Sequence, residues 1–291
     1  MLRDYRVFES FAYHMVNLAQ QKRIDKEFDL NGTFYAFDST TIDLCLSLYD
    51  WARFRSTKSG IKVHTQLDIR TEIPTSFTIT DAVVHMSRLP VTYLTEDILI
   101  CAVFITLTNV SSFFVIREKR RPKYEITACE DVLEGTDNVL QDQTIRFTGK
   151  RNCTNYPSEI RRIVYYSPEM NRTFTYYTNN FYLKASDIAL LYKNRWKVEM
   201  FFKFLKQHLR VKSFWGNSEN AVRIQIYVAI ITYCLVTIIE SELKLNRDIY
   251  AVMRILGSSM LVKDNIKELF SHAEYDILHK KDGQLELDFT S

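Results

Sequence analysis

Glycine and proline are scarce in this chain, with only 7 and 5 of them among 291 residues. Such low counts exclude collagen-like repeats, flexible linkers and long low-complexity tails. The five cysteines are scattered and form no C-x-x-C pair, so we expect neither a zinc knuckle nor a disulfide framework. The net charge is only +3, which does not by itself indicate a nucleic-acid partner.

Apolar side chains are plentiful enough for a large core, since hydrophobic residues make up 46% of the chain and aromatic residues 13%. The longest apolar run, Ile226–Ile239, contains Thr and Tyr and is short for a bilayer, so it predicts a buried helix and no membrane span. No charged segment followed by an apolar run opens the chain, and we therefore expect a cytoplasmic protein.

The periodicity of the sequence changes along the chain in a way that predicts a mixed α/β fold. Helical spacing occupies residues 1–25, and two long helices are expected later, at about Ser186–Leu209, with Ser186 as the N-cap, and about Asn220–Leu243. Strand-like segments lie between them, at Thr33–Phe37, Ile61–Ile69, Ile73–Thr80 and throughout 112–182. An order of helix, strands and then helices excludes a regular βαβ array.

The first candidate for chemistry is Asp38, in the segment FYAFDSTTIDL. An apolar strand runs directly into this aspartate, so we expect its carboxylate at a strand end, where a rigid element can present it to a metal. The alternative is that Asp38 opens a turn or caps a helix, as a lone Asp commonly does. Asp43 is a local rival, but we expect it to be solvated.

The second candidate is a polar stripe on the predicted helix LLYKNRWKVEMFFKFLKQHL. Its members are Tyr192, Arg195, Glu199 and Lys206, which at about 100° per residue lie within about 60° of one another. An adjacent stripe of apolar residues should face the core: Leu191, Val198, Phe202, Leu205 and Leu209. Spacing alone also allows an ordinary solvated face, with Arg195 and Glu199 as an i,i+4 ion pair.

Together, Asp38 and the Tyr-x2-Arg-x3-Glu-x6-Lys pattern resemble the DDE transposases of bacterial insertion sequences. The similarity is to the group defined by that four-residue signature, which is complete in this chain. Further blocks agree in the same order, and they extend the resemblance over most of residues 5–240: GIKVHTQLD, IPTSFTITDAVVH, FFVIRE and SFWGNSENAVRIQIYVAII.

The resemblance implies an RNase H-like catalytic core with a β-rich insertion and C-terminal helices. We therefore expect four regions: a helical remnant at 1–30, the first part of the core at 31–111, the insertion at 112–182, and the rest of the core with the glutamate helix at 183–291. In the family, three carboxylates hold two Mg²⁺ or Mn²⁺ ions for DNA cleavage and strand transfer. The resemblance makes Asp38 and Glu199 the catalytic metal ligands.

The remaining signature residues, Tyr192, Arg195 and Lys206, are implied to contact phosphates of the transposon end. Other basic positions, Arg117 among them, could extend that track. The partners expected from the family are double-stranded DNA, as transposon ends and target, and a second copy of the chain on paired ends. Such a protein would be associated with the nucleoid.

The chain departs from the family at the second catalytic aspartate, which normally stands in an Asp-Arg-Gly-Tyr-like block. Residues 86–112 contain no such block. Codons permitted for Tyr93–Phe104 spell Phe-Asp-Arg-Gly-Tyr when they are read from the third base of the Tyr93 codon. We therefore predict that two compensating frameshifts, or sequencing errors, bracket roughly residues 86–111. A stop codon in that frame of the gene, or the absence of Asp-Arg-Gly-Tyr from it, would disprove this. Asp97 lies near the required place, in a different context.

The N-terminus is a second departure, because only about thirty residues precede the first core strand, where the family usually carries a helical DNA-binding region. We therefore expect a truncated and impaired transposase. Two alternatives stay open. One is a metal-dependent nuclease with the same core, and the other is a non-catalytic remnant that binds DNA or dimerises with an intact transposase.

Overall fold

The computed structural model describes most of the chain before residue 271. The described residues are 4–23, 30, 32–55, 58–84, 98–101, 113–118, 122–130, 138–149, 156, 158–207, 214–245, 247–258, 265 and 267–270.

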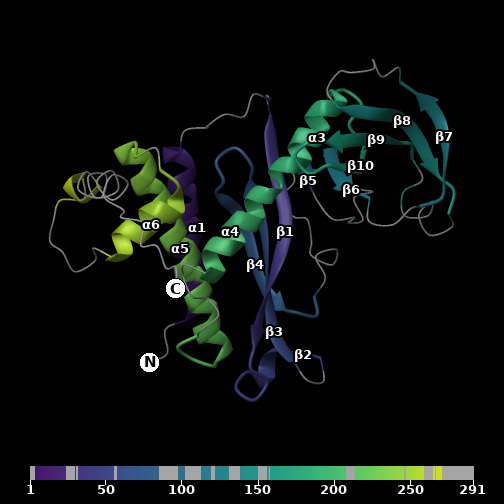
Figure 1. Ribbon diagram of the computed structural model, residues 1–291. Helices are drawn as coiled ribbons and strands as arrows, with labels where there is room; N and C mark the ends of the chain where they lie inside the picture. Colours follow the sequence, from purple (N-terminus) through teal and green to yellow (C-terminus); the bar gives the residue numbers. More distant parts are fainter. Residues whose placement is uncertain are drawn as a thin grey trace, which may run out of the picture.

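One continuous ten-stranded sheet runs through the molecule (Figure 1). Its strands are β1 (Thr33–Leu44), β2 (Arg53–Arg55), β3 (Lys58–Asp68), β4 (Pro74–Asp81), β5 (Ile98–Cys101), β6 (Phe113–Arg117), β7 (Tyr124–Cys129), β8 (Val139–Phe147), β9 (Ile160–Ser167) and β10 (Arg172–Thr178). Their order across the sheet is β2-β3-β1-β5-β6-β10-β9-β8-β7, and β4 pairs with β3. The mixed α/β fold predicted from the sequence is confirmed.

The half of the sheet that contains β1 has the pairing of an RNase H-like core. β1 pairs antiparallel with β3, and β3 pairs antiparallel with β4. On the other side of β1, β5 is parallel to β1 and β6 is parallel to β5. The three strands expected from Thr33, Ile61 and Ile73 onward are all present. β1 extends seven residues further than expected, because its β-branched residues 40–42 continue the ladder with β3.

The other half of the sheet is antiparallel and is joined to the core through β6. β10 pairs with β6, and the ladder continues through β9 and β8 to the edge strand β7. This half has its own apolar cluster, formed around Phe114, Ile145 and Tyr177. The strands expected in 112–182 are therefore present, and the first of them, β6, also belongs by pairing to the core.

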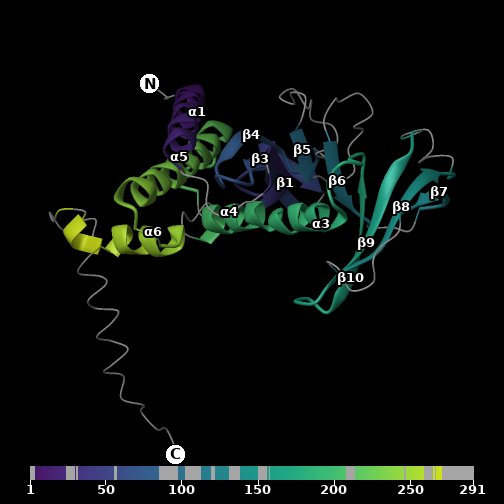
Figure 2. The ribbon, with the colours of Figure 1, turned by 90° about the horizontal axis from the view of Figure 1, so that it is seen from above.

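Helices cover one face of the core strands, and α3 and α4 follow each other almost in line beneath them in Figure 2. The helices are α1 (Tyr5–Lys22), α3 (Ala185–Asn194), α4 (Trp196–Gln207), α5 (Glu219–Leu243) and α6 (Ile249–Ser258), with a 3-10 turn η1 at Asp50–Ala52. α1, α4 and α5 enclose the main core against β1, β3 and β4.

The apolar helix α5 is the central helix of this layer. By length and composition alone it could cross a membrane, since its most apolar window has a mean hydropathy of 2.0, but 61% of that window is buried inside the protein. Side chains such as Ile226, Ile230 and Cys234 are fully buried. Burial raises the pKa of the Cys234 thiol to about 12. The expectation of a core helix from about Asn220 to Leu243 agrees with this packing.

Candidate active site

Asp38 lies in the middle of β1, so the expectation that it stands at a strand end is wrong. It pairs with Thr65 of β3, and that ladder continues to Leu44. On the opposite side of β1 the described parallel ladder with β5 ends at Ala36, two residues before Asp38. Asp38 is therefore held rigidly by β3 and lies next to the end of the β5 ladder. Asp43, the local rival, is exposed as expected.

The predicted long helix is divided at Arg195 into α3 and α4. The backbone N–H of Arg195 donates to Tyr192 O, three residues earlier, which tightens the chain locally. The helix also begins earlier than expected, because Lys184 takes the N-cap position and Ser186 lies in the first turn. The junction places the Arg195 side chain beside β1.

The apolar stripe of the helix faces the core as predicted. Leu191, Val198, Phe202 and Leu205 are all buried, and Leu209 lies outside the described residues. Because the polar stripe borders this contact, the α4 carboxylate is directed toward the sheet and not into open solvent. The glutamate in question, Glu199, has 34% of its side chain exposed.

One guanidinium group joins the two candidate carboxylates. Arg195 Nη1 donates to Asp38 Oδ2 at 2.6 Å, and Arg195 Nη2 donates to Glu199 Oε1. Both interactions are ion pairs, and the first joins residues 157 positions apart in the sequence. The structure thus brings Asp38 and Glu199 to the same group, although Arg195 and Glu199 also form the i,i+4 pair that spacing alone allowed.

The surroundings keep Arg195 charged. Burial works against its charge, but Tyr192, Glu199 and Asp38 outweigh burial and raise the pKa of the guanidinium. Only 19% of its side chain is exposed. Because guanidinium is protonated at any working pH, the three groups carry one positive and two negative formal charges whenever both carboxylates are ionised. Arg195 then neutralises the charge of one of the two carboxylates.

The other two members of the stripe differ in how near they lie to this pair. The Tyr192 ring packs on Tyr176 of β10 at 4.9 Å between centroids, and the Arg195 guanidinium lies 5.5 Å from the Tyr192 ring. Lys206 is half-buried in the last turn of α4. Three of the four residues thus gather around Asp38, and Lys206 lies further along the helix.

Carboxylates are ligands that suit a hard divalent cation, whereas the guanidinium of Arg195 has no lone pair to offer a metal. Mg²⁺ is commonly held by one or two carboxylates, with water completing its coordination. In the described part of the chain, no group of three or more Asp, Glu, His or Cys side chains is close enough to hold a metal. Asp38 and Glu199 are the two carboxylates that the described site offers to a divalent cation.

The segment that should supply the second catalytic aspartate falls largely outside the described residues. Between β4 and β6 the structure describes residues 82–84 and β5, and β5 reads Ile-Leu-Ile-Cys. Asp97 and the remainder of 85–97 and 102–112 lie outside the description. The predicted frameshifts and the use of Asp97 therefore stay predictions.

A buried ion pair that the sequence did not indicate connects the antiparallel half of the sheet to the segment before α3. Arg161 of β9 donates from Nε and Nη2 to the two carboxylate oxygens of Asp142 on β8, at 2.8 and 2.5 Å. Its Nη1 donates to Asn180 O and, at 2.6 Å, to Leu183 O, just before α3. No spacing signal identifies this pair, because its members come from different strands.

Two exposed arginines, Arg117 and Arg172, lie on the face of the sheet that carries Asp38. Ala36 of β1 and Val115 of β6 lie level with each other, because both pair with Cys101 of β5. Asp38 and Arg117 each follow two positions later on these parallel strands, so they also lie level. Arg117 and Arg172 both lie over the Phe174 ring, at 5.8 and 5.5 Å from its centroid. Neither forms an ion pair with any residue in the described ranges. Arg117 therefore lies in the same row as Asp38, and the Arg117–Phe174–Arg172 stack extends from it as a cationic surface.

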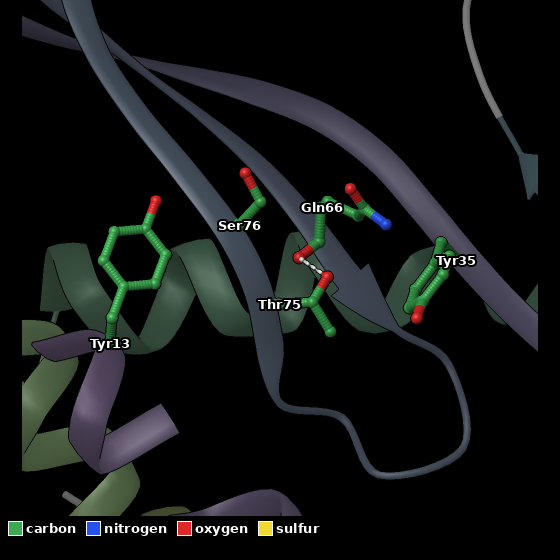
Figure 3. A pocket seen from close by; sticks show the side chains of 5 residues that line it. All are labelled: Tyr13, Tyr35, Gln66, Thr75 and Ser76. Atoms are coloured by element: carbon green, nitrogen blue, oxygen red, sulfur yellow. Dashed lines mark hydrogen bonds between the residues drawn. The ribbon is translucent and has the colours of Figure 1, made fainter. Parts of the chain in front are cut away.

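A pocket of about 370 Å³ lies elsewhere, near the turn between β3 and β4 (Figure 3). It is lined by Tyr13, Tyr35, Gln66, Thr75 and Ser76, and the Thr75 hydroxyl donates to the Gln66 carbonyl. Tyr35 and Gln66 belong to the face of the sheet opposite Asp38, as the alternation along β1 and β3 requires. No carboxylate or cation lines the pocket, so we assign the chemistry to the Asp38 site.

Comparison with known proteins places the chain among transposases. A family model described as "Transposase DDE domain" matches residues 102–235. The "Putative transposase y4zB" of Sinorhizobium fredii is 32% identical over 232 residues, which cover 75% of this chain and 63% of that protein. The "Probable transposase for insertion sequence element IS5377" of Geobacillus stearothermophilus is 26% identical, with 71% and 56% covered.

A third transposase and one solved structure also match the chain. The "Putative transposase for insertion sequence element IS4SA" of Synechocystis is 29% identical over 53% of this chain and 42% of that protein. A piggyBac transposase synaptic complex with hairpin DNA overlaps 89% of this chain and 56% of that chain, with a TM-score of 0.42 and 9% identity, which does not establish a shared fold. The chain spans less than two thirds of the length of the curated relatives. The resemblance to the DDE transposases of bacterial insertion sequences is therefore confirmed, since residues 102–235 match the DDE domain of transposases and two of the similar proteins are named as insertion-sequence transposases.

Proposed function

We propose that this chain acts on DNA as an insertion-sequence transposase, with Asp38 and Glu199 as the carboxylates of a divalent-cation site for phosphodiester cleavage and strand transfer. The observation that supports this most is the shared guanidinium. A cationic group already lies between two carboxylates that are far apart in the sequence and come from β1 and α4. When bound, Mg²⁺ would supply activation of the attacking oxygen and stabilisation of the leaving oxygen.

The chain's own residues would hold and orient the DNA around that centre. β3 fixes Asp38 on a paired strand, and the packed apolar stripe of α4 fixes Glu199, so both ligands come from rigid elements. Phosphates would meet Lys206 on one side and the Arg117–Phe174–Arg172 stack on the other, where cations pair with backbone charge. A dimer on paired ends, as the family implies, belongs to the same proposal.

Cleavage of insertion-element ends tests this function. We expect Mg²⁺-dependent cutting that EDTA abolishes, and we expect it to be weak in the given chain and stronger in a chain carrying the alternate reading frame around residues 86–111. The reason is that the restored aspartate would complete the first shell of the cations. Nicking of unrelated DNA without strand joining would instead favour the nuclease alternative.

The sequence of residues 86–112 contains no Asp-Arg-Gly-Tyr block, which gives the non-catalytic alternative its support. Under that alternative, DNA binding would be salt-sensitive, independent of metal and unaffected by Asp38→Ala. Equal activity of the given and restored chains would argue against the impairment that we propose.

Lys206→Ala should weaken DNA binding and lower the slope of log K against log salt by about one unit, if the side chain neutralises one phosphate. We expect a similar change for Arg117→Ala. Arg146→Ala is the matched control, because Arg146 is an exposed arginine of the same antiparallel half that already pairs with Glu159 at 3.2 Å. Binding isotherms at several salt concentrations measure the slope, and unchanged slopes in the first two variants would remove these residues from the DNA track.

A further inference from the structure

The Arg195 guanidinium and a divalent cation would require the same carboxylate oxygens. Asp38 Oδ2 accepts from Arg195, and Asp38 Oδ1 accepts from the backbone N–H of Ser39 at 2.8 Å. Both oxygens of Asp38 are therefore engaged. On Glu199, Oε1 is taken by Arg195. A cation that draws one oxygen from each carboxylate would meet a guanidinium already in contact with both residues.

Charge makes the two occupants incompatible. Two carboxylates attract one cationic group strongly, but a second cation placed a few ångströms from the guanidinium adds a like-charge repulsion that grows as the site is shielded from water. The three side chains are 19–34% exposed, so this repulsion is only partly screened. The flexible arginine can leave the site, whereas Asp38 on its paired strand cannot.

We propose that Arg195 occupies the place of the cation in the metal-free protein, so that its ion pairs to Asp38 and Glu199 and the binding of a divalent cation exclude one another. This inference rests on the proposed function, because it concerns the same carboxylates. It has two consequences. The arginine keeps the carboxylates together before metal arrives. It also lowers the apparent metal affinity, because only the molecules in which the ion pairs are open can bind the metal.

Titration of the full chain with Mn²⁺, without DNA, tests the inference. We compare the wild type with Arg195→Gln by calorimetry and by the electron paramagnetic resonance signal of free Mn²⁺. Removal of the competing guanidinium should tighten Mn²⁺ binding by about tenfold. Binding of Mn²⁺ should also raise the melting temperature of Arg195→Gln more than that of the wild type, because the variant leaves two carboxylates facing each other without a counter-ion.

Arg223→Gln is the control variant, since Arg223 has closely similar surroundings away from the site. It pairs with Glu219 four residues away at 2.8 Å and lies 5.1 Å from the Tyr5 ring. We expect its Mn²⁺ affinity to equal that of the wild type. Arg195→Lys is a second test variant, because a lysine keeps the charge but lacks the planar fork that reaches both carboxylates, and it should show intermediate affinity.

An Mn²⁺ affinity that is unchanged or weaker in Arg195→Gln would overturn the inference, because the arginine would then orient the carboxylates and not compete for them. If Arg195→Gln does not fold, Arg195→Lys takes its place. Tighter Mn²⁺ binding than in the wild type then supports the inference, and unchanged or weaker binding overturns it. Failure of the proposed function looks different. In that case the Glu199→Gln variant would bind Mn²⁺ as tightly as the wild type, or neither protein would bind Mn²⁺ at all.

Discussion

Glu199→Gln should abolish divalent-cation-dependent cleavage by any active form of this chain and leave its fold intact. The substitution keeps the shape of the side chain and removes one of the two carboxylates that meet at Arg195. A metal ligand contributes several kcal/mol to transition-state stabilisation, so the expected loss is roughly a thousandfold or more. The measurement is the initial rate of strand cleavage in Mg²⁺ by the chain with its restored reading frame, with circular dichroism as the check on folding.

Glu219→Gln provides the comparison for this experiment. Glu219 also forms an i,i+4 ion pair with an arginine, Arg223, but it lies in the first turn of α5 and its side chain is 52% exposed. We expect its cleavage rate to match that of the unmodified chain. Cleavage that survives Glu199→Gln would remove the glutamate from the reaction, and an equal loss in both variants would show that the effect comes from helix stability.

The largest effect on stability is expected for Arg161→Leu. Its guanidinium is 10% exposed, holds the 8% exposed carboxylate of Asp142, and caps two carbonyl groups that precede α3. Removal of one partner of such a buried pair leaves an uncompensated charge and costs about 3–5 kcal/mol. Urea unfolding measures the change. Because this contact fixes the start of α3, we also expect the variant to weaken the positioning of Arg195 and Glu199.

Two further variants separate the buried charge from general effects of substitution. Arg146→Leu removes an exposed ion pair of the same strand system and should change the unfolding free energy by about 0–1 kcal/mol. The double variant Arg161→Leu/Asp142→Leu removes both charges and should recover much of the stability lost in the single variant. If the double variant is no more stable than Arg161→Leu, the loss reflects the carbonyl contacts and not an unpaired carboxylate.

The helix stripe was predictable from sequence because its information is local. Offsets of 3, 7 and 14 fix a common face whatever surrounds the helix, and burial of Val198 and Phe202 on the adjacent face follows from the same periodicity. The break at Arg195 was not predictable, since no Gly or Pro interrupts residues 186–209, and its position reflects a local backbone hydrogen bond to Tyr192.

The position of Asp38 shows the limit of strand prediction. A carboxylate followed by Ser and Thr suggests the end of a strand, yet the ladder with β3 continues for six more residues because the hydrogen bonds of β1 depend on its neighbours and not on its own sequence. The Arg161–Asp142 pair and the Arg117–Phe174–Arg172 stack were missed for the same reason. Their members meet only through strand pairing, and residue types alone do not select them.

A thermodynamic cycle for Mn²⁺ binding tests most directly whether Asp38 and Glu199 serve one and the same ion. The four proteins are the wild type, Asp38→Asn, Glu199→Gln and the double variant, each titrated in the absence of DNA. If both carboxylates hold one ion, each single change should weaken binding by at least about tenfold, and the double variant should bind little more weakly than the single variants. Losses that simply add, or wild-type affinity in either single variant, would contradict a shared metal centre.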